Sequence, residues 1–453
     1  MAAVTTHPVL ASRDTLRSLS DARWWFGLAI LSLLLAGSLS IAPVVGRVPV
    51  LAAMVDSGFA TRSLVVHVNL ALGVWFFAFL AGMFCLLPGA ASVRLSKPAA
   101  LLGVAGTLMF FCAFFVRDAA PVKSNYVPAL DHWLFLTGLG LFAGSVALSF
   151  VDARLLSRQS SALLPPGSVA ALRLGALVYL LAMGTLFAAW ATQPAGLEPL
   201  PYFERLFWGG GHVLQFANVL GMCAAWLLLL CRATGKPVLK SPLLVPGLVL
   251  LALPTLAGPW LATREDGWGW FTMMMQLGIF PVVLGLALCA GLALWRGRGQ
   301  LAPGALRSPG FVGFATSAGM TLVGFTLGAL ISAQDTLIPA HYHVNIGAVT
   351  AAYMATILTL AGDFGLRPRS ARMRSLATWQ PLVYGVSQVI FAGGFGYAQA
   401  ERKVYGTQQV LRTTGQWIGM SVMGVGGLFA LVAGILFLAV LVSGWRGRVR
   451  PAA

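Results

Sequence analysis

Apolar runs recur twelve times along this chain of 453 residues, and they constrain its fold more than any other feature. Each run comes near or exceeds the length at which an α-helix crosses the hydrocarbon core of a bilayer. The runs lack the alternation of strands, and an open sheet would leave backbone groups unsatisfied in lipid, so helices are expected. The sequence therefore predicts an all-α integral membrane protein with twelve transmembrane helices. The expected spans are residues 24–45, 63–87, 99–116, 129–150, 169–192, 206–230, 243–261, 268–295, 310–333, 338–360, 379–398 and 417–442.

The runs follow one another without a large hydrophilic insertion. We therefore expect residues 24–442 to form one membrane domain, between a cytoplasmic N-terminal tail, 1–23, and a basic cytoplasmic C-terminal tail, 443–453. The first run follows a polar, arginine-containing segment and is too long for the apolar core of a cleaved signal. It is expected to remain as the first helix.

The basic residues predict the orientation of the bundle. With the N-terminus inside, 20 of the 30 lysines and arginines fall at the inner ends of the spans, nine fall at the outer ends, and Arg173 lies within a span. Cytoplasmic loops of membrane proteins carry such an excess. The net charge of +17 is thus assigned to a face that meets anionic lipid, and no nucleic-acid partner is expected. We expect a multi-pass protein of a prokaryotic cytoplasmic (inner) membrane with both termini in the cytoplasm.

Five histidines fall within the expected spans, and all of them lie on even-numbered ones. They are His67 in the second span, His132 in the fourth, His212 in the sixth, and His341 and His343 in the tenth. Each lies in the first third of its span, and even-numbered spans start at the outer face. A histidine in hydrocarbon is costly without a partner, and packing histidines would not be expected to share one depth. The pattern indicates a cofactor layer in the outer half of the membrane.

His341 and His343 are separated by two residues in an expected helix. A step of two is a rotation of about 200°, so the two rings must leave opposite faces of the helix at almost the same depth. They cannot easily share one metal ion, but each can hold a different planar cofactor. Imidazole suits iron, copper and zinc. One natural scheme has His67 and one of the pair bind a haem from both sides, while the other binds a second haem from one side.

The ordered set of these residues resembles subunit I of the haem-copper oxidase superfamily, which includes cytochrome c oxidases and nitric oxide reductases. The set consists of the early His67 in the second span, Trp208-Gly209-Gly210-Gly211-His212 in the sixth, and His341-Tyr342-His343 in the tenth. The resemblance covers nearly the whole chain, with the same helix numbers and the same membrane side. It implies a twelve-helix bundle that holds a low-spin and a high-spin haem.

The resemblance also implies a role for each histidine. His67 and His343 would be the axial ligands of the low-spin haem, and His341 the proximal ligand of the high-spin haem. His212 stands where the family's sixth helix supplies the first copper ligand. Two haems are expected, and b is the expected type.

Haem propionates near the aqueous boundary need basic partners. In the family, the loop between helices 11 and 12 supplies a basic pair for them. Arg402, Lys403 and Arg412 lie in the corresponding outer loop of this chain. The alternative is that these residues only make the loop soluble.

This chain departs from the family's pattern at the copper site. The family's seventh helix contributes two adjacent copper-binding histidines, whereas the span 243–261 has no histidine and no tyrosine. The residue four positions after His212 is Phe216, and the nearest polar neighbour of His212 along the chain is Gln215. One histidine would not hold copper in the usual way. Bound copper is therefore doubtful.

Three roles remain open for His212. It would be a second axial ligand of the high-spin haem, or a distal group that polarises a small ligand. It would otherwise bind a lone metal ion with help from the thioethers of Met273, Met274 or Met275, which suit copper(I). Those methionines would equally fill gaps in the bundle. His132 follows Asp131 and would form a hydrogen-bonded pair with it, or contact a haem or a partner subunit.

Three functions are compatible with these observations. The first is a haem-binding respiratory oxidoreductase of the oxidase type, which takes electrons from a cytochrome c or quinol and works with a partner subunit that carries haem c or copper. The second is a non-catalytic diheme electron-transfer or haem-based sensor protein. The third is a twelve-helix transporter, against which stands the lack of a buried acidic residue for ion coupling.

Overall fold

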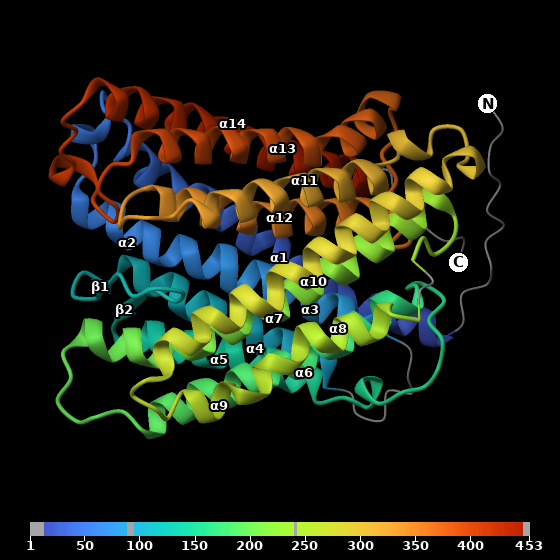
Figure 1. Cartoon of the computed structure of the whole chain (residues 1–453), viewed down its shortest axis with the longest axis horizontal. Coiled ribbons are helices and arrows are strands. Elements are labelled where there is room, and N and C mark those ends of the chain that lie inside the picture. Colours follow the sequence, from blue (N-terminus) through green and yellow to red (C-terminus); the bar gives the residue numbers. More distant parts are fainter. Residues whose placement is uncertain (1–12, 88–94, 240–241, 447–453) are drawn as a thin grey trace.

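The computed structural model describes residues 13–87, 95–239 and 242–446, in which long helices run side by side along the longest axis (Figure 1). The helices are α1 (Arg13–Val45), α2 (Ser57–Val68), α3 (Trp75–Cys85), α4 (Ser96–Cys112), α5 (Trp133–Phe150), α6 (Pro166–Ala191), α7 (Pro199–Thr234), α8 (Leu244–Ala252), α9 (Gly258–Leu261), α10 (Gly267–Arg296), α11 (Pro309–Ala329), α12 (Leu337–Leu360), α13 (Ala371–Ala398) and α14 (Thr414–Arg446). A π-helical turn, η2 (Asn69–Val74), joins α2 to α3, and a 3₁₀ turn, η5 (Leu253–Ala257), joins α8 to α9.

These helices form the twelve expected spans of an all-α membrane bundle. In the described residues, eleven helical segments are long and apolar enough to cross a membrane. The remaining long helix is α13, which has 28 residues and packs against α12 and α14. It is less apolar because it begins with Arg372 and Arg374 and buries the polar side chains of Gln380 and Ser387.

The ends of the bundle differ from the expected boundaries. α1 begins at Arg13, so residues 13–23 extend the first helix instead of forming a separate tail. α14 likewise continues to Arg446, into the expected C-terminal tail. Residues 1–12 and 447–453, the rest of both expected tails, lie outside the described residues. Helical backbone therefore continues beyond the apolar run at both ends of the chain.

The fourth span contains the clearest correction to the expected boundaries. It begins at Trp133, because residues before it form a hairpin in which β1 (Ala120–Val122) pairs antiparallel with β2 (Ala129–Asp131). His132 is the N-cap of α5, and its Nδ1 accepts a hydrogen bond of 3.2 Å from the backbone N–H of Leu134. The prediction that His132 lies within this helix is wrong. A helix N-terminus offers free N–H groups, and the imidazole satisfies one of them.

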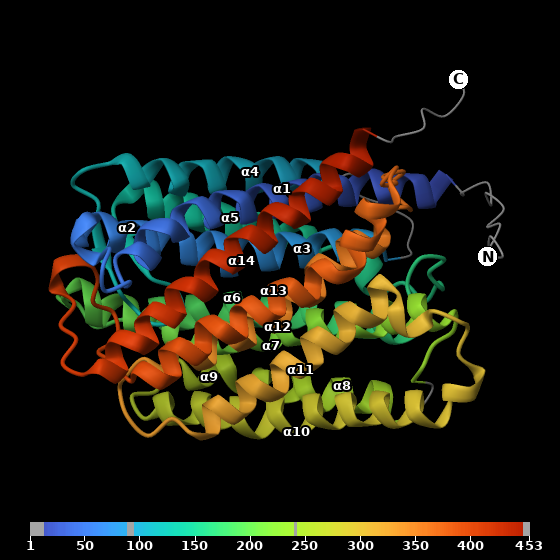
Figure 2. The ribbon, with the colours of Figure 1, turned by 90° about the horizontal axis from the view of Figure 1, so that it is seen from above.

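α7 and α12 form the centre of the bundle. Within their most apolar windows, 89% of α7 and 78% of α12 are buried, against 22% for both α10 and α14. Seen from above, α7 and α12 lie in the middle, with α4 and α10 at opposite edges (Figure 2). The helices that carry His212, His341 and His343 are therefore the ones best shielded from lipid.

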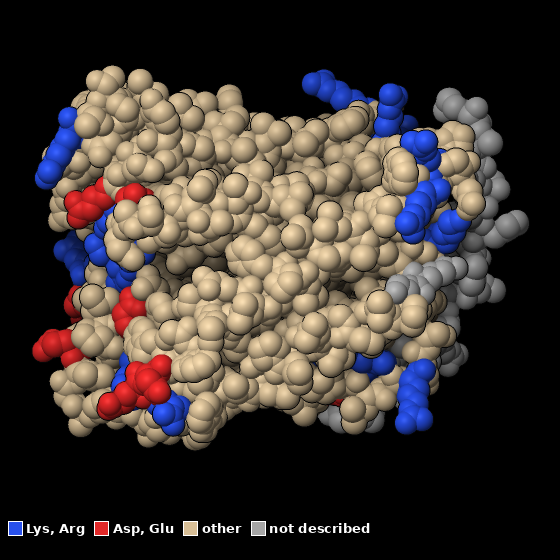
Figure 3. Space-filling view, viewed as in Figure 1, with Lys and Arg blue, Asp and Glu red and all other residues tan. Residues whose placement is uncertain are grey.

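The charged side chains separate the two ends of the bundle. On the face shown in Figure 3, acidic residues gather at the end that carries the hairpin, and basic residues dominate the end near both termini. This distribution agrees with an inner face at the termini. The hairpin end then corresponds to the outer face that the sequence predicts.

A buried ion-pair cluster ties α1 to the segment that directly follows α5. Arg154 Nη2 lies 3.0 Å from Asp21 Oδ2, and Arg154 Nη1 lies 3.7 Å from Asp152 Oδ2. The side chains of Arg154 and Asp152 are 3% and 7% exposed. Removing one partner of a buried pair leaves uncompensated charge, which costs about 3–5 kcal/mol.

We therefore expect Arg154→Leu to lower the free energy of unfolding by about 3–5 kcal/mol. The midpoint of thermal unfolding of the detergent-solubilised protein would report the loss. Arg264→Leu is the matched control, since Arg264 pairs with Asp266 on an exposed loop, where ion pairs contribute little. Equal midpoints for the two variants would contradict a stabilising role of the buried cluster.

Candidate cofactor site

A cavity of about 710 Å³ opens among the helices, and the loop of the hairpin lines part of it. It lies in the size range of pockets that enclose small molecules and cofactors. Its wall includes residues of α1, α2, α7, α10, α11, α12, α13, α14 and the hairpin. His67, His341 and His343 all line it. The structure thus brings three of the five predicted histidines to one cavity.

His67 enters this cavity from α2 with its ring fixed by the backbone. Its Nδ1 lies 2.8 Å from the carbonyl oxygen of Ala36 on α1 and must donate, because a carbonyl can only accept. Nε2 therefore carries the lone pair that can bind a metal. Such a carbonyl contact is the usual way in which proteins orient a ligating imidazole.

The π-helical turn η2 starts two residues after His67, and π turns are frequent at functional sites. The Nδ2 of Asn69, at its first position, donates to the carbonyl oxygens of Val65 at 2.9 Å and Pro128 at 2.7 Å. Asn69 thus joins the helix that carries His67 to the loop of the hairpin.

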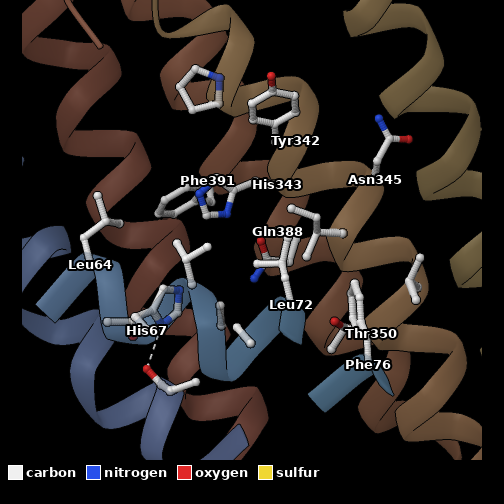
Figure 4. Close-up of a pocket in the computed structure, with 18 of the residues that line it drawn as sticks. Leu64, His67, Leu72, Phe76, Tyr342, His343, Asn345, Thr350, Gln388 and Phe391 are labelled. Atoms are coloured by element: carbon white, nitrogen blue, oxygen red, sulfur yellow. Dashed lines mark hydrogen bonds between the residues drawn. The ribbon is translucent and has the colours of Figure 1, made fainter. Parts of the chain in front are cut away.

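His343 enters the same part of the cavity from α12, and its ring and that of His67 approach it from opposite sides (Figure 4). The His343 ring packs on Phe391 of α13 with centroids 4.4 Å apart, and Gln388 lies within hydrogen-bonding reach of it. Both histidines can therefore reach one planar group between them.

His341 leaves α12 toward α11 instead. Its Nδ1 donates to the carbonyl oxygen of Gly324 at 2.7 Å, which again leaves the lone pair on Nε2, 3.4 Å from Asn345 Nδ2. A Cβ added to Gly328 would lie 2.6 Å from His341 Cε1, so this glycine makes room for the ring. Asn345, one turn further along α12, donates from Nδ2 to the His341 carbonyl oxygen at 3.1 Å. The contacts confirm that His341 and His343 leave opposite faces of α12.

His212 does not line the cavity, although the sequence suggested it as a distal group. It is 1% exposed, and Tyr126 from the hairpin lies between it and the cavity. His212 Nδ1 donates to the carbonyl oxygen of Trp208 at 2.7 Å, so Nε2 must be an acceptor. The hydroxyl of Tyr126 donates to that nitrogen at 2.8 Å. The polar group that faces the cavity here is therefore the phenol of Tyr126.

The three glycines before His212 each face a large side chain. A Cβ would lie 2.6 Å from the ring of Phe271 at Gly209, 2.4 Å from Leu186 at Gly210, and 2.5 Å from Tyr126 Cβ at Gly211. Tyr126 itself has a φ of 63°, an unusual value for a residue with a side chain. Gly211 and the backbone of Tyr126 together fit the phenol against His212.

Four basic side chains line the outer end of the cavity, and we call them the basic roof: Arg47, Lys123, Arg402 and Lys403. Within the described residues none of them forms a salt bridge. Arg47 is 2% exposed, donates to the carbonyl oxygen of Glu401 at 2.8 Å and lies over the Tyr405 ring, but its Nε has no partner among the described residues. Unpaired buried cations are costly, so the roof suits an anionic group in the cavity.

The sequence predicted only part of this roof. Arg402 and Lys403 are in the cavity wall as expected, whereas Arg412 is exposed and the structure does not bring it there. Arg47 and Lys123 are among the nine basic residues at the outer ends of the expected spans. Their sequence signal is weak, because each is a single basic residue near a span end.

The hairpin tip is held over the cavity by a charged clamp. Lys123 and Lys403 each donate from Nζ to the other's carbonyl oxygen, at 2.9 Å and 2.6 Å. Lys403 also donates to Asn125 Oδ1 at 3.0 Å, and Glu204 accepts from the backbone N–H of Asn125 at 2.9 Å. Burial lowers the pKa of Lys403, and the nearby carboxylate of Glu204 opposes that shift. The four residues fix the loop that carries Tyr126.

We expect Glu204→Ala to loosen the hairpin by about 1.5–3 kcal/mol, the usual contribution of hydrogen bonds to a charged group. Amide hydrogen exchange of residues 120–131 should become faster. Glu198→Ala, at an exposed position at the start of the same helix, should leave that exchange unchanged. Unchanged exchange in both variants would show that the clamp does not hold the hairpin.

The other predicted metal ligands do not converge. Met275 lines the cavity, and its Sδ lies 3.8 Å from the Tyr126 hydroxyl, whereas Met273 and Met274 line a separate apolar cavity between α8 and α10. Throughout the described part of the chain, no group of three or more histidine, cysteine, aspartate or glutamate side chains is placed to hold a metal ion. Of the three methionines, only Met275 could assist at the site.

Two curated relatives match most of the chain. An uncharacterized protein of Aquifex aeolicus (strain VF5) is 28% identical over 352 residues, which cover 75% of this chain and 84% of that protein. An uncharacterized protein of Rickettsia prowazekii (strain Madrid E) is 22% identical over 501 residues, with coverage of 92% and 94%. No family model matches the sequence.

The solved structures add a similar fold. A heme-copper terminal oxidase, determined by cryo-EM as a dimer, superposes on this chain with a TM-score of 0.77 and 17% sequence identity. The superposition covers 97% of this chain and 85% of that one. At this identity the likeness concerns the arrangement of the helices. The chain therefore has the fold of this heme-copper terminal oxidase chain.

Proposed function

We propose that the chain is a haem-binding subunit of a respiratory membrane oxidoreductase, with a low-spin and a high-spin haem in the outer half of the bundle. The observation that carries this proposal is the pairing of His67 and His343 across a cavity whose outer end is basic. Two imidazoles with a shared space between them suit the iron of a six-coordinate haem, and the roof suits its propionates.

Each side chain of the cavity has a definite task in this proposal. His67, held by Ala36, and His343, beside Gln388, bind the low-spin iron. His341, held by the Gly324 carbonyl, binds the high-spin iron. Arg47, Lys123, Arg402 and Lys403 hold the propionates. When bound, the haems supply one-electron transfer and, at an open position, ligand binding.

The copper site is degenerate in our proposal. The segment from α8 to α9 has no histidine, and the Nε2 of His212 already accepts the Tyr126 hydroxyl. Copper in the family's manner would need more imidazole ligands than this chain provides. Reduction of O2 or NO by this chain would proceed without the usual copper ion.

A second candidate is a diheme electron-transfer or haem-sensor protein without catalysis. The observation in its favour is that Tyr126 separates His212 from the cavity. A spectral shift with CO would indicate an open high-spin site. The absence of a spectral shift with CO would favour an electron-transfer protein whose high-spin haem has no open position.

The surroundings of the protein follow from the same proposal. The bundle lies in the lipid bilayer, in our proposal a prokaryotic inner membrane. Electrons would come from a cytochrome c or a quinol at the outer side, through a partner subunit that carries haem c or copper. No nucleic-acid partner is proposed, because the basic residues gather at the inner face and in the roof.

Haem and metal stoichiometry on one purified preparation tests the proposal. We expect two haems per chain, low-spin and high-spin bands in the reduced-minus-oxidised spectrum, and less than one copper. A colourless preparation from a haem-sufficient host would contradict both candidate functions. One copper ion per chain would contradict only the proposal that the copper site is degenerate.

A further inference from the structure

Tyr126 occupies a place that nothing in the sequence pattern assigned to it. Its phenol lies on the wall of the cavity between α7 and α10, the helices that carry His212 and Met275. His341 projects toward α11, which borders the same side of the cavity, where Phe280 and Phe325 stack with ring centroids 4.1 Å apart. A group held by His341 would therefore share this chamber with the Tyr126 hydroxyl.

We propose that Tyr126 is the hydrogen-bonding group for a small ligand on the open side of the haem held by His341, and that His212 positions Tyr126. This inference rests on the proposed haem site. The ligand class is a diatomic molecule or a small anion that can accept one hydrogen bond. Ile279, Phe280 and Phe325 form an apolar part of the wall on the side of α10 and α11, and the hydroxyl supplies a directional contact there.

The hydroxyl can donate its proton either to His212 or to a ligand in the cavity. Without a ligand, it donates to His212 Nε2 at 2.8 Å. With a ligand, rotation about the C–O bond turns the proton into the cavity. His212 cannot donate from Nε2, because its proton is on Nδ1 and bonded to the Trp208 carbonyl oxygen. His212 thus acts on the chamber through Tyr126 only.

The surroundings of Tyr126 hold it in this position. Gly211 leaves room for its Cβ, and the rings of His212 and Trp208 pack against it with centroids 4.4 Å and 5.8 Å away. The preceding residue, Asn125, is fixed by Glu204 and Lys403. A φ of 63° at a tyrosine persists only where its neighbours determine it, and such residues cluster at ligand sites.

Binding of fluoride to the oxidised protein and of CO to the reduced protein tests this role. Fluoride on ferric haem accepts a hydrogen bond from a distal donor, so Tyr126→Phe should weaken its binding about tenfold. The C–O stretching frequency of the CO adduct should rise. Haem content and the low-spin band should not change. Tyr405→Phe, which removes a hydroxyl at another part of the cavity wall, should leave both measurements unchanged.

A second variant moves Tyr126 without altering its chemistry. Gly211→Ala places a methyl group 2.5 Å from Tyr126 Cβ, so it should reproduce the effects of Tyr126→Phe. Gly210→Ala is the matched control, since its new methyl group meets Leu186 instead. Fluoride binding and the CO band should stay as in the native protein in this control.

Three outcomes would overturn the inference while the haem proposal stands. The first is native fluoride and CO behaviour in Tyr126→Phe with both haems present. The second is CO binding that appears only in Tyr126→Phe, which would make the phenol an axial ligand. The third is a copper ion that is lost in His212→Ala, which would make His212 a metal ligand. Loss of all haem signals from the native protein would instead refute the proposed function itself.

Discussion

Replacing His67 by alanine should remove the low-spin haem and leave a haem that binds CO. The haem content should fall from two per chain to one, because iron held by His343 alone loses half of its axial ligation. The α band of the low-spin haem would disappear from the reduced-minus-oxidised spectrum. His343→Ala should give the same spectrum, since the two rings approach the same space from α2 and α12 (Figure 4).

His132→Ala is the matched control for that experiment. His132 is not in the cavity wall, and its ring caps the first turn of α5. The variant should keep both haems and lose only about 1 kcal/mol of stability, as for other N-caps. If His67→Ala keeps its low-spin band, the assignment of the axial ligands is wrong.

Gly328→Ala should have the complementary effect and remove the CO-binding haem. The new Cβ would lie 2.6 Å from His341 Cε1 and 2.7 Å from Nδ1, so the ring must leave its place beside α11. That shift breaks the 2.7 Å bond to the Gly324 carbonyl oxygen, which fixes the tautomer and direction of the ring. We expect the haem content to fall from two to one, with the low-spin band unchanged and no spectral shift with CO.

The same helix offers a control for this glycine. A Cβ at Gly319 has no neighbour within 4 Å, so Gly319→Ala should keep both haems and the CO shift. His341→Ala should reproduce the spectrum of Gly328→Ala. Full CO binding in Gly328→Ala would mean that the glycine does not set the position of His341.

The fold could be predicted well from the sequence because the apolar runs and the basic loops report on the bilayer directly. A segment such as 338–360 must cross as a helix whatever its neighbours are. The spacing of His341 and His343 likewise predicts opposite directions from helix geometry alone. These features depend on the solvent and on local geometry, not on which helices meet.

The parts of the site that were missed depend on contacts between distant segments. Tyr126 reaches His212 only because a hairpin forms before α5, and the same hairpin moves His132 out of its expected helix. Arg47 turns inward because the carbonyl of Glu401 and the ring of Tyr405 receive it. No periodicity in the sequence encodes such contacts. From the sequence alone, a basic residue of the basic roof therefore cannot be told from any other basic residue of an outer loop.

The reciprocal bonds of Lys123 and Lys403 have a consequence for the order of assembly. They join segments 280 residues apart, one before α5 and one between α13 and α14. Contacts of such separation form late, because the chain between them must first be ordered. The clamp therefore cannot close the outer end of the cavity before the loop between α13 and α14 has reached the hairpin.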